Sequence, residues 1–215
     1  FEGGVITTDD AQLADRLRLL RNFGFTGHEA TALVGTNAKM HEATAAMALR
    51  RGLVDLHSHM PVPCTGGMQF GNRYFKCWDH RGHGSLDLIG AVAKSCDVYF
   101  YQLGLRVQLA NMLADGVTMG FKDRTRVDLV NEVTPTWPAS TAYYDKVYGT
   151  RGWSNAVTLN LSIGQGENTQ TLVNMVRFYA ALASETGKSP VPYLVRPDSG
   201  EGFDLKLTRD QLNGL

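Results

Sequence analysis

The sequence has no excess charge of either sign and no long apolar run. Lys and Arg together number 21, as do Asp and Glu, so the net charge predicts no polyanion-binding surface and no nucleic-acid partner. No apolar run reaches the ~20 residues that span a bilayer, and the N-terminus has no basic and apolar segments of the secretory type. We therefore expect a soluble chain without a membrane segment.

Cysteine is scarce, because the chain of 215 residues has only three. An odd number cannot all pair within one chain, so a disulfide framework is not expected. Hydrophobic residues at 43% and charged residues at 20% are typical of a globular protein. The length suffices for one large domain or two small ones.

The stretch that organises the chain is GHGSLDLIGAVAKSCDVYFYQLG, residues 82–104. Ser85 is a candidate N-cap with Asp87 in the first turn, and apolar residues then recur at helical spacing. The polar triplet Ser95, Cys96 and Asp97 follows, and after it an aromatic run that predicts a second buried helix. Polar side chains between two buried helices are costly unless they are paired or used.

This stretch, extended to YFKCWDHRGHGSLDLIGAVAKSCDVYFYQLG and followed by MGFKDRTRVDLVNE and NLSIGQGENTQT, resembles the transpeptidase domain of class B, elongation-type penicillin-binding proteins. The resemblance implies a mixed α/β, mostly helical domain over residues 51–215, an incomplete form of the penicillin-binding and serine-β-lactamase-like transpeptidase fold. In that family Ser-x-Asn, or Ser-x-Asp as here, is the second of three active-site motifs. It implies that Ser95 relays a proton to the leaving amine and that Asp97 orients Ser95.

The resemblance also implies the ligands and the place of action. These are peptidoglycan stem peptides and β-lactams, at the extracytoplasmic face of the bacterial inner membrane. The turn Gly164-Gln165-Gly166 lies beside the cleft in the family, so Gln165 is either a substrate contact or part of a structural turn. The third motif, Lys-Thr-Gly, occurs nowhere in the sequence. We therefore expect a domain truncated before that motif and inactive as it stands.

Two residues depart from the family pattern in the segment MGFKDRTRVDLVNE. Lys122 and Arg126 stand where the family commonly has glycine. Because a side chain disfavours positive φ, we expect the local turn geometry to be altered.

Residues 1–50 show a different pattern, a short strand, a helix and a glycine stop. FEGGVITTDDAQLADRLRLLRNFGF followed by GTNAKMHEATAAMAL is similar to sugar aminotransferases of the DegT/DnrJ/EryC1/StrS type, which use pyridoxal phosphate. In that family the Schiff-base lysine would precede Phe1. Asn37 matches a residue that reaches the cofactor phosphate in some members, but without the lysine we do not expect this chain to bind pyridoxal phosphate.

The two resemblances meet at Thr36-Asn37-Ala38-Lys39-Met40, where penicillin-binding proteins have Ser-x-x-Lys-Met. One interpretation makes Thr36 the nucleophile and Lys39 its base, as in Ser-Lys catalysis. The other assigns GTNAKM to the aminotransferase-like segment, and we favour it because threonine is a bulkier nucleophile than serine. The junction is then either a natural fusion or an artefact of gene assembly.

Four residues have the composition of a metal site. Cys64 and Cys77 are 13 residues apart, His83 follows 6 residues later, and Cys96 a further 13. Three thiolates and an imidazole would form the closed tetrahedron that structural zinc prefers. Some elongation-type penicillin-binding proteins hold a metal at the positions of His83 and Cys96, and Cys77 and Cys64 would replace acidic ligands. The alternative is buried free thiols. His57, His59 and His80 are expected to be surface residues.

The sequence thus supports three functions of different classes. The leading one is a peptidoglycan D,D-transpeptidase domain that does not react with penicillin as it stands. The alternatives are part of a pyridoxal-phosphate aminotransferase and a non-catalytic module stabilised by zinc.

Overall fold

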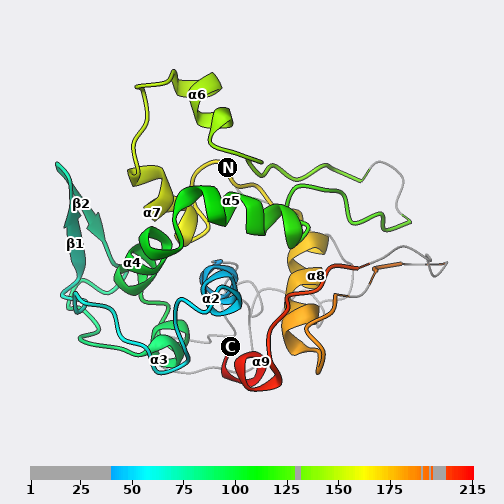
Figure 1. The fold of residues 1–215 in the computed structure, drawn as a ribbon, viewed down its shortest axis with the longest axis horizontal. Coiled ribbons are helices and arrows are strands. Elements are labelled where there is room, and N and C mark those ends of the chain that lie inside the picture. The colour runs from blue at the N-terminus through cyan, green and yellow to red at the C-terminus, as the bar shows by residue number, and fades with distance from the viewer. Residues whose placement is uncertain (1–39, 129–131, 190, 194, 196–201) are drawn as a thin grey trace, which may run out of the picture. The chain divides into compact units, whose positions relative to one another are not determined.

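The computed structural model describes residues 40–128, 132–189, 191–193, 195 and 202–215 (Figure 1). Its contacts divide the chain into two compact units, Phe1–Ala38 and Lys39–Leu215, and the fold below is that of the second unit. Thr36, Asn37 and Lys39 lie outside the described residues, so their assigned roles stay predictions.

The described part of the second unit is mostly helical with one small sheet, which confirms the expected fold class. The helices are α2 (His41–Arg50), α3 (Leu88–Ala93), α4 (Asp97–Val107), α5 (Leu109–Thr118), α6 (Ala142–Tyr148), α7 (Ala156–Ser162), α8 (Leu172–Ala183) and α9 (Arg209–Gly214). The strands are β1 (Gly67–Phe70) and β2 (Arg73–Lys76). No described helix combines the length and apolar character needed to cross a membrane.

Helix α4 forms the centre of the core. Its aromatic run is buried, as predicted, and Phe100 is fully enclosed. Helices α2 and α7 pack against α4, and the ring of His41 on α2 stacks on Phe100 with centroids 4.4 Å apart. Thr44 Oγ1 donates to the carbonyl of Ser162 at 2.8 Å, which joins α2 to α7. Figure 1 shows α2, in blue, among the surrounding helices.

Helix α2 bears on the domain division predicted from the sequence. The prediction places the boundary after residue 50, whereas α2 packs in the same compact unit as the residues that follow it. Four of the ten residues of α2 are alanine, and all four are buried. A helix with such small side chains can approach its neighbours closely on several sides.

Helix starts follow the predicted capping residues in part. Asp87, and not Ser85, is the N-cap of α3, because its side chain accepts from the Gly90 backbone N–H at 2.8 Å. Ser85 Oγ instead lies 3.1 Å from His59 Nδ1. Thr171 caps α8, because its side chain accepts from the Asn174 backbone N–H, and Thr208 forms a capping box at the start of α9.

The segment before Cys77 forms a hairpin. β1 and β2 are antiparallel, with Gly67 opposite Lys76 and Phe70 opposite Arg73. The buried ring of Phe75 meets Tyr101 of α4 edge-on at 5.5 Å, and the Tyr101 hydroxyl donates to the Lys76 carbonyl. The hairpin therefore delivers Cys77 to the start of α4.

The loops beyond α5 are held by internal contacts. Trp137 is buried and its indole N–H donates to the Leu113 carbonyl at 2.9 Å, while that of Trp153 donates to Asp145. Both indole groups are thus hydrogen-bonded within the protein. Arg126 has φ of 62°, so the backbone there keeps a left-handed conformation although the residue has a side chain.

Candidate active site and metal cluster

The triplet Ser95, Cys96 and Asp97 forms the junction between α3 and α4. Ser95 has φ of 48°, and its N–H donates to the Val92 carbonyl at the end of α3. Cys96 is the N-cap of α4 and Asp97 is its first residue. Ser95 is half-buried, whereas Cys96 and Asp97 are buried. The left-handed turn at Ser95 lets the chain reverse from one helix into the next.

Asp97 connects three parts of the fold. Its Oδ2 accepts from the backbone N–H of Trp78 at 2.9 Å, and its Oδ1 lies 3.3 Å from Nε2 of His41. The carboxylate therefore joins the loop after β2 to the first residue of α2. Asp97, a buried polar residue of the triplet, thus has partners in the core, as buried polar groups need.

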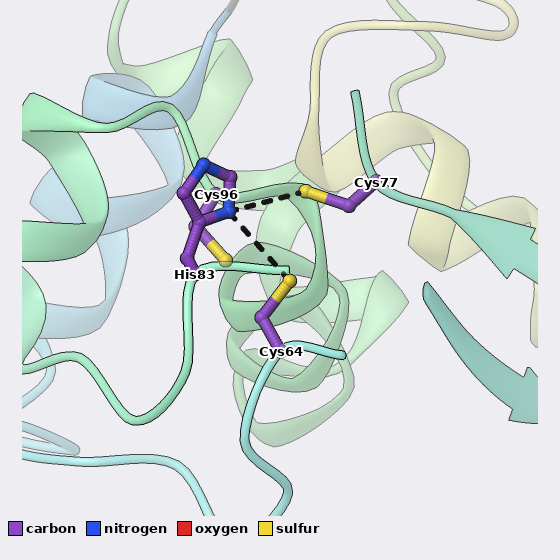
Figure 2. A group of neighbouring side chains, drawn as sticks. All are labelled: Cys64, Cys77, His83 and Cys96. Carbon is purple, nitrogen blue, oxygen red and sulfur yellow. Dashed lines mark hydrogen bonds between the residues drawn. The ribbon is translucent and has the colours of Figure 1, made fainter. Parts of the chain in front are cut away.

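The four predicted metal ligands converge on one point (Figure 2). Their ligand atoms all lie within 4.8 Å of one another. Nδ1 of His83 is 3.6 Å from Sγ of Cys64 and 3.5 Å from Sγ of Cys77. The three cysteines are buried and His83 is half-buried. Residues up to 32 positions apart in the sequence are thus brought together.

Backbone pairing holds the two loops of the cluster together. Cys64 and Gly84 exchange N–H to carbonyl bonds of 2.8 and 2.9 Å, and the Cys77 N–H donates to the Gly66 carbonyl at 2.9 Å. Gly82 has φ of 84°, and a Cβ there would lie 2.3 Å from the Cys64 carbonyl oxygen. Only glycine fits at Gly82, and this close approach orients His83 toward the thiols.

The spacing of the donors fits a zinc ion. Tetrahedral bonds of about 2.3 Å to sulfur and about 2.1 Å to nitrogen place ligand atoms about 3.6 Å apart. The two distances from His83 to sulfur have this value. A hydrogen bond from Cys96 lowers the pKa of Cys77 to about 5, and sharing that proton raises the pKa of Cys96. The cluster thus stabilises a thiolate, the form that binds metal.

Three other histidines lie outside the cluster. His57, His59 and His80 are exposed, as predicted. Within the described residues, this cluster of Cys64, Cys77, His83 and Cys96 is the one group of three or more His, Cys, Asp or Glu side chains arranged to hold a metal.

Sequence reasoning missed two residues that complete the site. Trp78 follows Cys77 directly, its ring lies 5.3 Å from the ring of His83, and its indole N–H donates to the Lys94 carbonyl. It therefore bridges the cluster and the end of α3. His41 pairs with Asp97 across a gap of 56 residues, and no local sequence signal indicates that contact.

The Gly164-Gln165-Gly166 turn lies against the start of α2. Gly164 has φ of 79°, and a Cβ there would lie 2.9 Å from the backbone nitrogen of Met40. Asn168 Nδ2 also donates to Met40 Sδ. Gln165 is exposed, and its backbone N–H donates to the Asn160 carbonyl. The turn thus reaches the residue next to Lys39.

Comparison with known families gives two matches. The sequence model for the penicillin binding protein transpeptidase domain matches residues 41–214. The chain belongs to this family. The model for the DegT/DnrJ/EryC1/StrS aminotransferase family matches residues 1–59, so the two matches overlap over α2 and the loop after it. Both resemblances inferred from the sequence are therefore present.

Curated relatives carry the same family assignment. The chain is 28% identical over 171 residues to "Peptidoglycan D,D-transpeptidase MrdA" of Acinetobacter baumannii, covering 77% of this chain and 24% of the relative. It is 30% identical over 129 residues to the protein of that name from Haemophilus influenzae, covering 59% of this chain and 19% of the relative. The chain thus spans about a quarter of the length of the curated relatives it matches.

Solved structures agree with this fold. The chain matches penicillin-binding protein PBP2 of Pseudomonas aeruginosa in complex with WCK 5153 with a TM-score of 0.71 and 25% identity, over 81% of this chain and 41% of that one. It matches PBP2 of Helicobacter pylori in its complex with MreC with a TM-score of 0.68 and 25% identity, over 81% and 32%.

Proposed function

We propose that residues 41–215 belong to a peptidoglycan D,D-transpeptidase that acts on stem peptides ending in D-Ala-D-Ala. The contact of Asp97 with His41 is the observation that carries the proposal. It ties the Ser95-Cys96-Asp97 motif to the start of α2, the helix that in this family follows the nucleophile and its lysine. The names of the curated relatives support the same reaction.

In this reaction a hydroxyl oxygen attacks the carbonyl between the two D-alanines, and the terminal D-alanine leaves as an amine. Ser95 would pass a proton to that amine, and Asp97, with its place fixed by Trp78 and His41, would position the motif. A second amine would then take the acyl group and release the hydroxyl. Lys39 would be the base and Thr36 the attacking group only if the junction before α2 preserves the first motif. Otherwise both belong to the aminotransferase-like segment.

The Gly164-Gln165-Gly166 turn would border the peptide. Its position beside Met40 places Gln165 near the start of α2, and its exposure leaves the side-chain amide able to bond a peptide carbonyl or N–H. β-Lactams would bind at the same place as the peptide, and the protein to which this chain belongs would act at the extracytoplasmic face of the bacterial inner membrane.

The cluster of Cys64, Cys77, His83 and Cys96 would hold a structural zinc ion. A closed set of three thiolates and one imidazole leaves no position for water, so the ion would contribute stability and not chemistry. Cys96 belongs to both the cluster and the Ser95-Cys96-Asp97 motif. A bound ion would therefore fix the turn that presents Ser95.

Peptide binding tests the proposed function directly. Two-dimensional NMR of the intact chain would be followed during titration with diacetyl-L-Lys-D-Ala-D-Ala and with its L-Ala-L-Ala counterpart. We expect the D,D peptide to shift the amide signals of Ser95 and Gln165 and the L,L peptide to leave them in place. Equal shifts with both peptides, or none, would contradict the proposal.

Covalent reaction is a separate question. We expect no covalent labelling of the chain by a fluorescent penicillin, because the interpretation that we favour gives it no nucleophile. Labelling that maps to Thr36 by peptide mass spectrometry would show that the first motif survives in the form Thr-x-x-Lys.

A further inference from the structure

A cleft that shares no lining residue with the metal cluster has a cavity volume of about 440 Å³. It is formed by the end of α5, the segment 120–126, α8 and Phe203. None of the residues assigned to catalysis, substrate or metal above lines it. Its most distinctive feature is three arginines that come from two separate segments, Arg124, Arg126 and Arg177.

The cleft is strongly basic in a chain with no net charge. Three arginines line it together with one acidic residue, Asp123, which gives the lining residues a formal charge of +2. The whole chain has equal numbers of basic and acidic residues. The concentration of arginine is therefore local, and a concave surface with a net positive charge attracts anions more than a flat surface does.

The backbone at Arg126 is held in a conformation that disfavours a side chain. Its φ is 62°, in the left-handed region where glycine is the usual residue. Glu132 enforces this geometry, because its carboxylate accepts from the N–H groups of Thr125 and Arg126 at 2.6 and 2.9 Å. A strained backbone held in place by its surroundings is typical of functional sites, which makes Arg126 a candidate binding residue.

The other two arginines are oriented by contacts with the protein. Arg124 Nε donates to Thr134 Oγ1 at 2.7 Å. The half-buried Arg177 lies over the ring of Phe203 at 5.1 Å, and burial, together with the nearby Arg126, lowers the pKa of Arg177. The carboxylate of Glu132, which does not line the cleft, acts to raise the pKa of Arg177 and offsets part of the positive charge around it. Guanidinium groups nevertheless stay protonated in proteins.

We propose that this cleft binds a phosphoryl or pyrophosphoryl group of a ligand. Planar guanidinium groups form paired hydrogen bonds with oxyanions, and three of them can surround a tetrahedral anion from different directions. A carboxylate has only two oxygens in one plane and would engage fewer of these donors. The cavity is larger than a single phosphate, so it accommodates a molecule that carries the group.

Calorimetric titration of the intact chain with sodium pyrophosphate, at fixed ionic strength, tests the proposal. We expect saturable binding that weakens about tenfold in Arg126→Gly and in Arg124→Gln, the loss typical of a charge-assisted hydrogen bond. Arg151→Gln removes an exposed arginine elsewhere and should bind as the unaltered chain does. Citrate serves as a carboxylate ligand of comparable charge.

A melting curve separates loss of a ligand contact from loss of fold. Because glycine relieves the left-handed φ, we expect Arg126→Gly to raise Tm by a few degrees while it weakens pyrophosphate binding. The proposal is overturned if the unaltered chain gives no binding heat, or if Arg126→Gly binds pyrophosphate as tightly as the unaltered chain. Citrate that binds as well as pyrophosphate would overturn the phosphoryl assignment. Neither outcome bears on peptide binding at Ser95.

Discussion

Nε2 of His41 lies 3.3 Å from Oδ1 of Asp97, and both side chains are buried. The contact joins the first residue of α2 to the first residue of α4. Because the other Asp97 oxygen accepts from the Trp78 N–H, one carboxylate connects α2, α4 and the loop that carries Cys77. The geometry of the Ser95-Cys96-Asp97 motif therefore depends on contacts with α2 and with the loop that carries Cys77.

Replacing Asp97 tests this dependence. Asp97→Ala removes the acceptor of Trp78 and the partner of His41, and leaving buried polar groups without partners costs about 2–4 kcal/mol of unfolding free energy. Asp97→Asn keeps an acceptor oxygen and should lose less. Urea unfolding measures both, with the exposed Asp210→Ala as the control. If Asp97→Ala is as stable as Asp210→Ala, the carboxylate does not hold these segments together.

Glu42 on α2 should make stability depend on pH. Burial is the main cause that raises the pKa of Glu42 in the folded chain, although Tyr179 donates to its carboxylate at 3.1 Å. Above about pH 4.5 the unfolded chain releases the Glu42 proton, whereas the folded chain still holds it. The free energy of unfolding therefore falls as the pH rises from about 4.5 to the folded pKa of Glu42. Glu42→Gln removes that loss.

The measurement is urea unfolding at several values between about pH 5 and about pH 8. We expect Glu42→Gln to lose less stability than the unaltered chain as the pH rises, and to be the more stable of the two at neutral pH. Glu185→Gln, which alters an exposed carboxylate, is the matched control. Parallel pH profiles for the unaltered chain and Glu42→Gln would contradict this account.

Two glycines of one turn make a matched pair. Gly164 and Gly166 both have positive φ, so alanine at either should cost about 1–2 kcal/mol of unfolding free energy for the backbone alone. A Cβ at Gly164 would also lie 2.9 Å from the Met40 nitrogen, whereas the nearest atom at Gly166 is 3.7 Å away. Gly164→Ala should therefore be the less stable variant by about 1 kcal/mol or more. Equal losses would mean that the turn is not pressed against α2.

The sequence predicted those parts of the site that local pattern determines. The four metal ligands could be proposed because Cys is rare in the chain and because the chemistry of Cys and His restricts what they bind together. The buried helix after the triplet could be proposed from its aromatic run, which lies in α4. Residues 159–163 show where a local pattern misleads. They alternate between apolar and polar side chains, which is typical of a strand, yet most of them lie in α7.

The contacts that could not be predicted are those between distant segments. Ser85 and Asp87 are both good N-cap residues, and the choice between them depends on which one the loop leaves free to accept from Gly90. The pairing of His41 with Asp97 depends on how α2 packs on α4, which no local pattern encodes. The left-handed φ of Arg126 likewise depends on Glu132, six residues further along the chain.

Zinc content is the measurement that tests the central claim most directly, namely that the motif around Ser95 is built on a metal cluster through Cys96. Protein prepared without added zinc would be analysed for bound metal, together with Cys77→Ser, Cys96→Ser and the exposed-histidine control His80→Gln. We predict one zinc ion per chain in the unaltered protein and in His80→Gln, and almost none in either serine variant. Equal metal in all four proteins, or none in any, would contradict the claim.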